Sequence, residues 1–248
     1  MHRFYLAPEN WHPDGLVLTG SEAHHCRNVL RLESTDKIVL FNGRGHEITA
    51  EIVSSDTAAI EVRKLHEAQT PPLRCRITLG QAIPKGKNMD LIVQKAVEIG
   101  AAEIAPILSD RTVVRLDEES AASKQAKWQT VAIEAAKQCG QNWLPQVQTP
   151  QPLAHFFKDH RGFDLQLIGS LQSDAVHLKK ILAQFSAEHG GRPTNVLMLV
   201  GPEGDFTPAE LSLARSQGCR PITLGPIVLR VETASIYCLS ILSYELLV

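Results

Sequence analysis

Cysteine is scarce in this sequence, and it is not arranged for cross-linking or metal binding. The five cysteines, Cys26, Cys75, Cys139, Cys219 and Cys238, are scattered and include no C-x-x-C pair. An odd, scattered set is typical of free buried thiols rather than of a disulfide framework or a zinc site. No helical or strand spacing gathers three of the ten histidines. We therefore expect no metal.

Long apolar runs and a strong net charge are also lacking. No stretch reaches the roughly 18 uninterrupted apolar residues that a membrane span needs. The opening, MHRFYLAPENWHPDG, has no apolar signal core. We therefore expect a cytoplasmic protein without a membrane segment. The formal net charge of −2 does not indicate general nucleic-acid binding, but basic residues outnumber acidic ones in residues 73–115, which allows a local basic surface.

The first 72 residues predict a small β-barrel. Four short segments, LVLTG, KIVLFNG, HEITAEIVSS and AAIEVRKLH, are separated by turn residues, and Asn42-Gly43 is a strong hairpin signal. One helix is expected over residues 22–32, with Ser21 as its cap. The polar EAQTPPL then ends in Pro71-Pro72 and marks a domain boundary.

From residue 73 onward, predicted strands alternate with predicted helices. The strands are RITLGQAI, AEIAPIL, LQLIGS, NVLMLVG and PITLG. The helices are expected over 89–100, with Asn88 as cap and Gly100 as stop, then over 120–139, 175–190, 208–218 and from about 232. This alternation predicts an α/β domain with a parallel sheet covered on both faces. The expected domains are 1–72 and 73–248.

Two segments partly match known nucleotide-binding motifs, but neither has all the residues that its motif requires. In GQAIPKGKN the second glycine comes one residue late, and Asn88 stands where a Walker loop needs Ser or Thr. NGRGHEI has Ile48 at the third glycine position of a dinucleotide fingerprint and lies in the predicted hairpin. Neither nucleotide-binding fold is expected.

Glycine–proline loops follow two of the predicted strands. LVGPEGDF, residues 199–206, ends a buried strand, and Thr207, Pro208 and Glu210 then form a capping box that begins a helix. LGPIVLR, residues 224–230, likewise places a glycine–proline pair after a strand. LIGS, residues 167–170, ends another strand and could form a third side of a binding site. The glycines serve a tight turn alone, or they leave backbone groups free for a ligand. Ligands of open parallel sheets bind at this edge, so we expect a flat slot suited to a planar base such as adenine.

Four stretches follow one another in the chain: SEAHHCRNVLR in the barrel, KGKNMDLIVQKAVEIGAAEIAPILSDRTVVR, LVGPEGDFTPAE and LGPIVLRVETA. In this order they resemble the RsmE family, whose members are uracil-N3 methyltransferases of 16S ribosomal RNA in the SPOUT class. The resemblance covers nearly the whole chain. It implies an N-terminal PUA-like barrel, a C-terminal trefoil-knotted domain, S-adenosylmethionine as cofactor and a homodimer. The chain departs from the family at Asp205, where a second glycine is usual, and at Val231, where Thr is common.

The resemblance and the loop pattern together give the expected cofactor site and chemistry. Arg230 is expected to stabilise the negative charge that uracil gains on losing its N3 proton, and its alternative role is to pair with Glu203 or Glu232. Glu203 is the second catalytic candidate, as a partner of the sulfonium or a proton acceptor, unless only its backbone matters. The expected cofactor-binding residues are Leu199, Val200, Gly201, Pro202, Glu203, Gly204, Ile168, Gly169, Leu224, Gly225, Ile227, Leu229, Arg230 and Thr233.

The RNA is expected to meet basic residues of both domains. Arg27 and Arg31 are four residues apart, which would place them on one face of the short helix. The alternative is that they form an ordinary solvated face. The expected phosphate contacts are Arg3, Arg27, Arg31, Lys85, Lys87 and Arg111.

The expected function is methylation, dependent on S-adenosylmethionine, of N3 of a uridine in 16S ribosomal RNA, with this RNA or the small ribosomal subunit as partner. Two other functions stay open. The first is a non-catalytic RNA-binding protein that retains the slot, against which the intact GPEG and LR motifs argue. The second is a related knotted enzyme acting on transfer-RNA ribose, against which the opening motif of the barrel argues.

Overall fold

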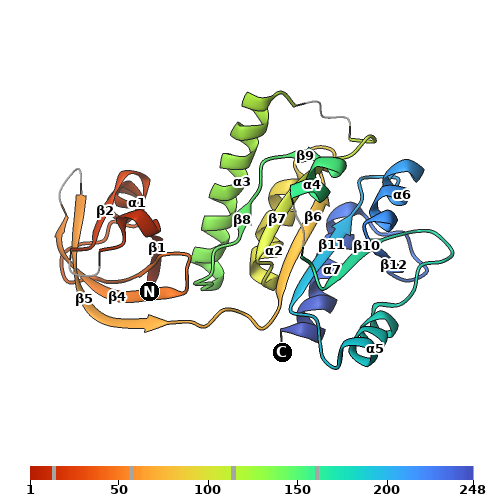
Figure 1. The fold of residues 1–248 in the computed structure, drawn as a ribbon. Coiled ribbons are helices and arrows are strands. Elements are labelled where there is room, and N and C mark those ends of the chain that lie inside the picture. Colours follow the sequence, from red (N-terminus) through yellow and green to blue (C-terminus); the bar gives the residue numbers. More distant parts are fainter. Residues whose placement is uncertain (13–14, 56–58, 113–115, 160–161, 248) are drawn as a thin grey trace. The chain divides into compact units, whose positions relative to one another are not determined.

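The computed structural model describes residues 1–12, 15–55, 59–112, 116–159 and 162–247, and the chain divides into two compact units (Figure 1). Unit 1 consists of Met1–Pro72 and Ile133–Leu144, and unit 2 consists of Leu73–Ala132 and Pro145–Val248. The sequence places residues 133–144 in the second domain, whereas they belong to the first compact unit.

Unit 1 is built on a five-stranded mixed sheet in the order β1-β3-β4-β5-β2. Strand β1 runs parallel to β3, and the other neighbouring pairs are antiparallel. The four strands expected from the sequence are present, and β1 is an addition. Alternate apolar side chains such as Ile38, Leu40 and Ile48 are fully buried in its core. The bounds are β1 (His2–Tyr5), β2 (Val17–Thr19), β3 (Lys37–Phe41), β4 (His46–Ser55) and β5 (Ala59–Gln69).

The predicted hairpin joins β3 to β4. The side-chain oxygen of Asn42 accepts the backbone N–H groups of Arg44 (2.8 Å) and His46 (3.2 Å). Gly43 adopts φ 71° and Gly45 φ 88°, which L side chains rarely adopt. The turn residues therefore set the register of the hairpin.

The expected helix over 22–32 is shorter and less regular than predicted. A short α1 (Gly20–His24) passes into one π turn (His25–Val29), closed by a bond from the Leu30 N–H to the His25 carbonyl (3.0 Å). Thr19, not Ser21, occupies the cap position. Arg31 then takes a left-handed φ of 55°, so the chain has left the helix before this residue. A 3-10 turn, Pro8–Asn10, precedes β2.

The segment 133–144 is fastened to the hairpin and to the end of β5. The Leu144 N–H donates to the Gly43 carbonyl (3.0 Å), and the indole N–H of Trp143 donates to the Thr70 carbonyl (2.9 Å). These bonds join residues about 70 to 100 positions apart in the chain, which local sequence patterns do not report.

Unit 2 contains a seven-stranded sheet in which every pair is parallel. Its order is β12-β10-β11-β6-β7-β8, with β9 also pairing with β7. The central strands are mostly apolar and buried, as expected for a parallel sheet that helices cover on both faces. The bounds are β6 (Arg76–Ala82), β7 (Glu103–Leu108), β8 (Gln146–Val147), β9 (Gln151–Pro152), β10 (Leu165–Gly169), β11 (Asn195–Val200) and β12 (Arg220–Ile222).

The helices of unit 2 pack on opposite faces of this sheet. The side chain of Ala82 shares a core cluster with α4 and α6, whereas the adjacent Gln81 accepts a hydrogen bond from Ser235 of α7. Since neighbouring residues of a strand point to opposite faces, α7 lies across the sheet from α4 and α6. Their bounds are α2 (Asn88–Ile99), α4 (Leu153–Asp159), α5 (Leu178–His189), α6 (Pro208–Ser216) and α7 (Val231–Leu246), and α3 (Glu118–Cys139) belongs partly to each unit.

Most predicted elements of unit 2 are confirmed, with exceptions at caps and in short segments. Gly100 ends α2 with a left-handed φ of 94°, as expected. Lys87 rather than Asn88 occupies the cap of α2, and the Asn88 amide donates to Glu232 (3.2 Å) instead. The two short strands β8 and β9 and the helix α4 were not predicted, because two-residue strands and two-turn helices carry little periodicity.

Candidate functional site

A cavity of about 530 Å³ lies at the carboxyl ends of β10, β11 and β12. Its walls are residues 169–172, 200–205 and 223–231, with Ala234 of α7. The strands are neighbours in the order β12-β10-β11, so their three loops leave the sheet side by side. The volume is in the range of small-molecule sites, and this edge is where open parallel sheets bind ligands.

The first loop turns sharply at residues 202–205. The Asp205 N–H donates to the Pro202 carbonyl (3.0 Å), and Gly204 has φ 85°, which makes a type II turn. A side chain at Gly204 would meet only Arg111 at 3.6 Å, so the positive φ is what this position requires. Gly201 is different, because a Cβ there would lie 3.1 to 3.2 Å from Asp205 and Phe206.

Contacts from neighbouring strand ends hold this first loop in place. The Glu203 carboxylate accepts the N–H of Lys85 (3.0 Å), which follows β6. Arg111, which follows β7, donates to the carbonyls of Gly204 and Asp205. The loop is therefore fastened to the ends of β6 and β7, the next strands in the sheet.

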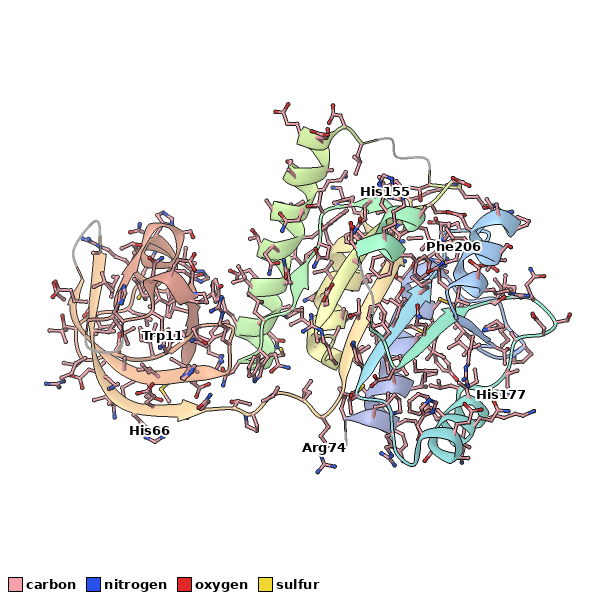
Figure 2. The ribbon with its side chains drawn as sticks, viewed as in Figure 1. Trp11, His66, Arg74, His155, His177 and Phe206 are labelled. Carbon is pink, nitrogen blue, oxygen red and sulfur yellow. The ribbon has the colours of Figure 1, made fainter. Side chains whose placement is uncertain are left out.

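The capping box predicted from the sequence fixes the start of α6. Thr207 accepts the Glu210 N–H (3.3 Å), and the Glu210 carboxylate accepts the Thr207 N–H (2.8 Å). Buried Glu210 also accepts bonds from Ser109 (3.1 Å) and from the N–H of Asp110 (3.0 Å). Phe206 lies buried just before the cap (Figure 2).

The loop after β12, residues 223–230, places apolar side chains and the Arg230 cation at the cavity. Ile227 and Val228 are each 74% exposed, and both line the cavity. In the part of the chain that the structure describes, the backbone N–H groups of residues 227–229 have no backbone acceptor. Arg230 is exposed at the cap position of α7, and within the described residues neither Glu203 nor Glu232 forms an ion pair with it.

The structure gathers most, but not all, of the expected cofactor residues. The residues that line the cavity are Gly169, Val200, Gly201, Pro202, Glu203, Gly204, Leu224, Gly225, Ile227, Leu229 and Arg230. Leu199 and Ile168 are buried in the core instead, and Thr233 is an exposed residue of α7 outside the lining. The lining also includes Ser170, Asp205, Pro226 and Val228, which lie in the loops expected from the sequence but were not among the expected contacts. Sequence reasoning missed Leu171, Gln172, Thr223, Val231 and Ala234. Leu171, Gln172 and Thr223 follow the ends of β10 and β12 closely, whereas Val231 and Ala234 belong to α7.

Comparison with known proteins shows which family this arrangement belongs to. Residues 71–243 match the RNA methyltransferase domain, and residues 18–65 match the RNA methyltransferase PUA domain. The ribosomal RNA small subunit methyltransferase E of Bacillus subtilis (strain 168) is 32% identical over 233 residues, 92% of this chain and 89% of that protein. The chain belongs to the ribosomal RNA small subunit methyltransferase E (RsmE) family.

Two solved structures extend this similarity to the fold of the RsmE family. The ribosomal RNA small subunit methyltransferase E from Neisseria gonorrhoeae, bound to S-adenosyl methionine, has a TM-score of 0.84 and 32% identity, covering 99% of this chain and 98% of that one. A methyltransferase from Legionella pneumophila, in complex with the cofactor SAM, has a TM-score of 0.85 and 32% identity, covering 98% and 97%.

The basic residues expected to contact RNA have differing surroundings in this RsmE family member. Arg3 is 14% exposed, with an ion pair to Glu47 (2.6 Å) and a bond to Asn142, so it serves the interior of unit 1. Arg27 lies in the π turn with Nη1 buried and without a partner among the described residues. Arg31 follows the turn in a left-handed conformation, so the expected shared helix face is wrong.

The remaining basic candidates lie near the pocket loops of unit 2. Lys85 and Lys87 are exposed in the loop between β6 and α2, and Arg111 lies in the turn after β7. The side chain of Arg111 is engaged by loop carbonyls, whereas the Lys85 side chain is not used in the contact its backbone makes with Glu203.

Four of the cysteines in this RsmE family member are buried. Burial raises the pKa of Cys75, Cys219 and Cys238 to about 12, so these thiols stay protonated near neutral pH. Across the described residues, no group of three His, Cys, Asp or Glu side chains is positioned to hold a metal ion. Among the described helices, none has the length and apolar character needed to cross a bilayer.

Proposed function

We propose that this protein transfers the methyl group of S-adenosylmethionine to N3 of a specific uridine in 16S ribosomal RNA, in the cytoplasm. The observation that carries the proposal is the cavity of three strand-end loops beside Arg230, whose guanidinium has no ion-pair partner among the described residues. Membership of the RsmE family supports the reaction class.

The pocket suits S-adenosylmethionine in volume and in the chemistry of its lining. Leu224, Ile227 and Leu229 offer apolar faces for a planar adenine, and the free N–H groups of residues 227–229 offer donors to its ring nitrogens. Val231 and Ala234 contribute further apolar lining from α7. When bound, the cofactor supplies a methyl group activated by a positively charged sulfur.

The protein's task is to make uracil N3 a nucleophile and to hold it in line. N3 carries a proton, and losing it leaves negative charge on the ring and its two carbonyl oxygens. The Arg230 guanidinium stabilises that charge, because it is a cation whose planar fork reaches paired acceptors. Glu203, exposed at the turn, is our candidate acceptor of the N3 proton. Holding N3, the methyl carbon and the sulfur in line lowers the activation barrier by several kcal/mol.

RNA phosphates are proposed to contact basic side chains of both units, of which all but the half-buried Arg27 are exposed. The candidates are Arg27 and Arg31 in unit 1, and Lys85 and Lys87 in unit 2. The PUA domain match over residues 18–65 includes the first pair and supports an RNA-binding role for unit 1. Arg3 and Arg111 are assigned to internal contacts instead.

The active species is proposed to be a homodimer. Helix α7 leaves Tyr237 (45% exposed) and Tyr244 (75% exposed) on one face, since residues seven apart lie two turns along the same side. Leu91 of α2 is also exposed, and α2 packs against α7. Aromatic residues of this kind are enriched at protein interfaces.

Unit 2 is proposed to contain the trefoil knot of the SPOUT class. The chain forms β10 and then β11, and it next crosses to β12 at the edge of the sheet. It then returns through residues 223–230 to α7, which packs against β6 and β11. Stretching one molecule by its ends tests this. A knotted chain, once fully unfolded, stays shorter than its contour of about 3.3 to 3.6 Å per residue.

Mapping methylated nucleotides by mass spectrometry in RNA from cells with and without this gene tests the proposed reaction. We expect one 3-methyluridine in 16S ribosomal RNA to disappear with the gene, and purified protein to restore it in free RNA or in small subunits. Loss of a transfer-RNA ribose methyl group would show the alternative enzyme. Binding of cofactor and RNA without any product would show a non-catalytic protein.

A further inference from the structure

Asp205 occupies a backbone position that would suit glycine better. It has φ 70°, directly after Gly204 at φ 85°. Residues other than glycine adopt this conformation in only a few per cent of cases, with aspartate and asparagine enriched. A side chain kept at such a position needs a compensating contact.

The Asp205 carboxylate makes two contacts that join separate walls of the pocket. Oδ1 accepts the N–H of Phe206 (2.8 Å), which follows in the same loop. Oδ2 accepts the N–H of Leu171 (3.4 Å), which lies in the loop after β10. Leu171 and Asp205 both line the cavity, so this carboxylate connects two of its three walls.

Arg111 holds the backbone of the same residue. Its guanidinium donates to the carbonyls of Gly204 and Asp205, the latter at 3.3 Å. Gly201 leaves room for the carboxylate, since a Cβ there would approach Oδ1 to 3.2 Å. Asp205 is therefore fixed from the β7 side and in turn reaches the loop that follows β10.

We propose that Asp205 is a positioning residue that sets the separation of the 169–172 and 200–205 loops and so tunes cofactor affinity. The proposal rests on the proposed function in taking S-adenosylmethionine as the ligand. Asp205 acts through the backbone of Leu171 and not on the methyl group. Its loss should therefore raise KM for the cofactor while leaving kcat at saturation close to the parent value.

Asp205→Asn is the sharpest variant. Asparagine tolerates the left-handed conformation and matches aspartate in shape, but it has one acceptor oxygen. That oxygen keeps the closer bond to Phe206, and the amide N–H₂ then faces the Leu171 N–H, which removes the link between the walls. We expect the dissociation constant for S-adenosylmethionine to rise about tenfold by calorimetry, with an unchanged melting temperature.

Asp205→Gly removes both contacts and relieves the unfavourable φ. It should weaken cofactor binding at least as much as Asp205→Asn without loss of stability. Asp174→Asn is the matched control, because Asp174 lies in the same loop as Leu171, pairs with Arg215 (2.8 Å) and does not line the cavity. It should bind cofactor as the parent does.

Hydrogen exchange of the peptide containing residues 169–172, measured without cofactor, reports the link directly. Exchange should be faster in both Asp205 variants than in the parent and in Asp174→Asn. Parent-like cofactor affinity in both variants would overturn the inference, as would unchanged exchange. A parent protein that does not bind S-adenosylmethionine would overturn the proposed function instead, while the exchange result would still show whether the link exists.

Discussion

At the scale of single residues, Arg230 lines the cavity, and among the described residues its guanidinium has no ion-pair partner. Its ion-pair alternatives, Glu203 and Glu232, contact the Lys85 N–H and Asn88 respectively. We expect Arg230→Ala to lower the single-turnover rate of methyl transfer by a factor on the order of a hundred, as for loss of a positioned electrostatic donor. Melting temperature and cofactor affinity should change little.

A matched control for this change is Arg215→Ala, since Arg215 pairs with Asp174 and does not line the cavity. It should keep the parent rate. If Arg230→Ala keeps its rate and loses RNA affinity, Arg230 is an RNA anchor, and the charge on the base is stabilised by other groups.

Arg27 and Arg31 carry the second prediction at this scale. Their joint replacement by alanine should weaken RNA binding and flatten its dependence on salt by about one to two units of slope, because two phosphate contacts are lost. Turnover at saturating RNA should survive. RNA titrations at several salt concentrations measure this, with Arg63→Ala as the control because Arg63 is exposed but pairs with Glu51 (2.8 Å). An unchanged slope would remove both residues from the RNA surface.

At the scale of elements, the start of α6 is fixed by a side chain and not by propensity alone. Thr207→Ala removes the cap and leaves the Glu210 N–H without its acceptor. The free energy of unfolding should fall by about 1 kcal/mol in urea titrations. Thr130→Ala is the control, because the Thr130 hydroxyl only bonds back within α3 (3.0 Å). Equal losses in the two variants would mean that the capping box contributes nothing particular.

Local signals predicted the elements well, and contacts between distant residues could not be predicted. The Asn42 hairpin, the Gly100 stop and the Thr207 capping box are confirmed because each depends on neighbours in sequence. The parallel pairing of β1 with β3 depends on residues about 36 apart, and no local pattern encodes it.

The same distinction separates the predicted site from the observed one. The glycine loops located the cavity correctly, since strand ends of a parallel sheet meet at one edge. Charge alone suggested RNA contacts for Arg3 and Arg111. Their actual partners, Glu47 in one case and the carbonyl of Gly204 in the other, are about 44 and 93 residues away in the chain. Partners at such separations can only be read from the fold.

At the scale of the whole molecule, the proposed dimer depends on the exposed face of α7. Replacing Tyr237 and Tyr244 together by aspartate places two charges on that face, which should dissociate the dimer because unpaired buried charges are costly. Light scattering at micromolar concentration measures this. Val53→Asp, at an exposed apolar position of unit 1, is the control and should leave the mass unchanged. A parent protein that is a stable and active monomer would contradict the proposal.

The attachment of residues 133–144 to unit 1 has a consequence for the order of events during synthesis. A ribosome that has made residues 1–72 has not yet made Trp143 or Leu144, which the hairpin and the end of β5 bind. At about 5 to 20 residues per second, the intervening chain takes roughly 4 to 14 s to appear. Until then, water takes the place of the Trp143 and Leu144 N–H groups at the Thr70 and Gly43 carbonyls. The N-terminal unit thus begins first but is completed only after residues 73–132, which belong to the other unit, have left the ribosome.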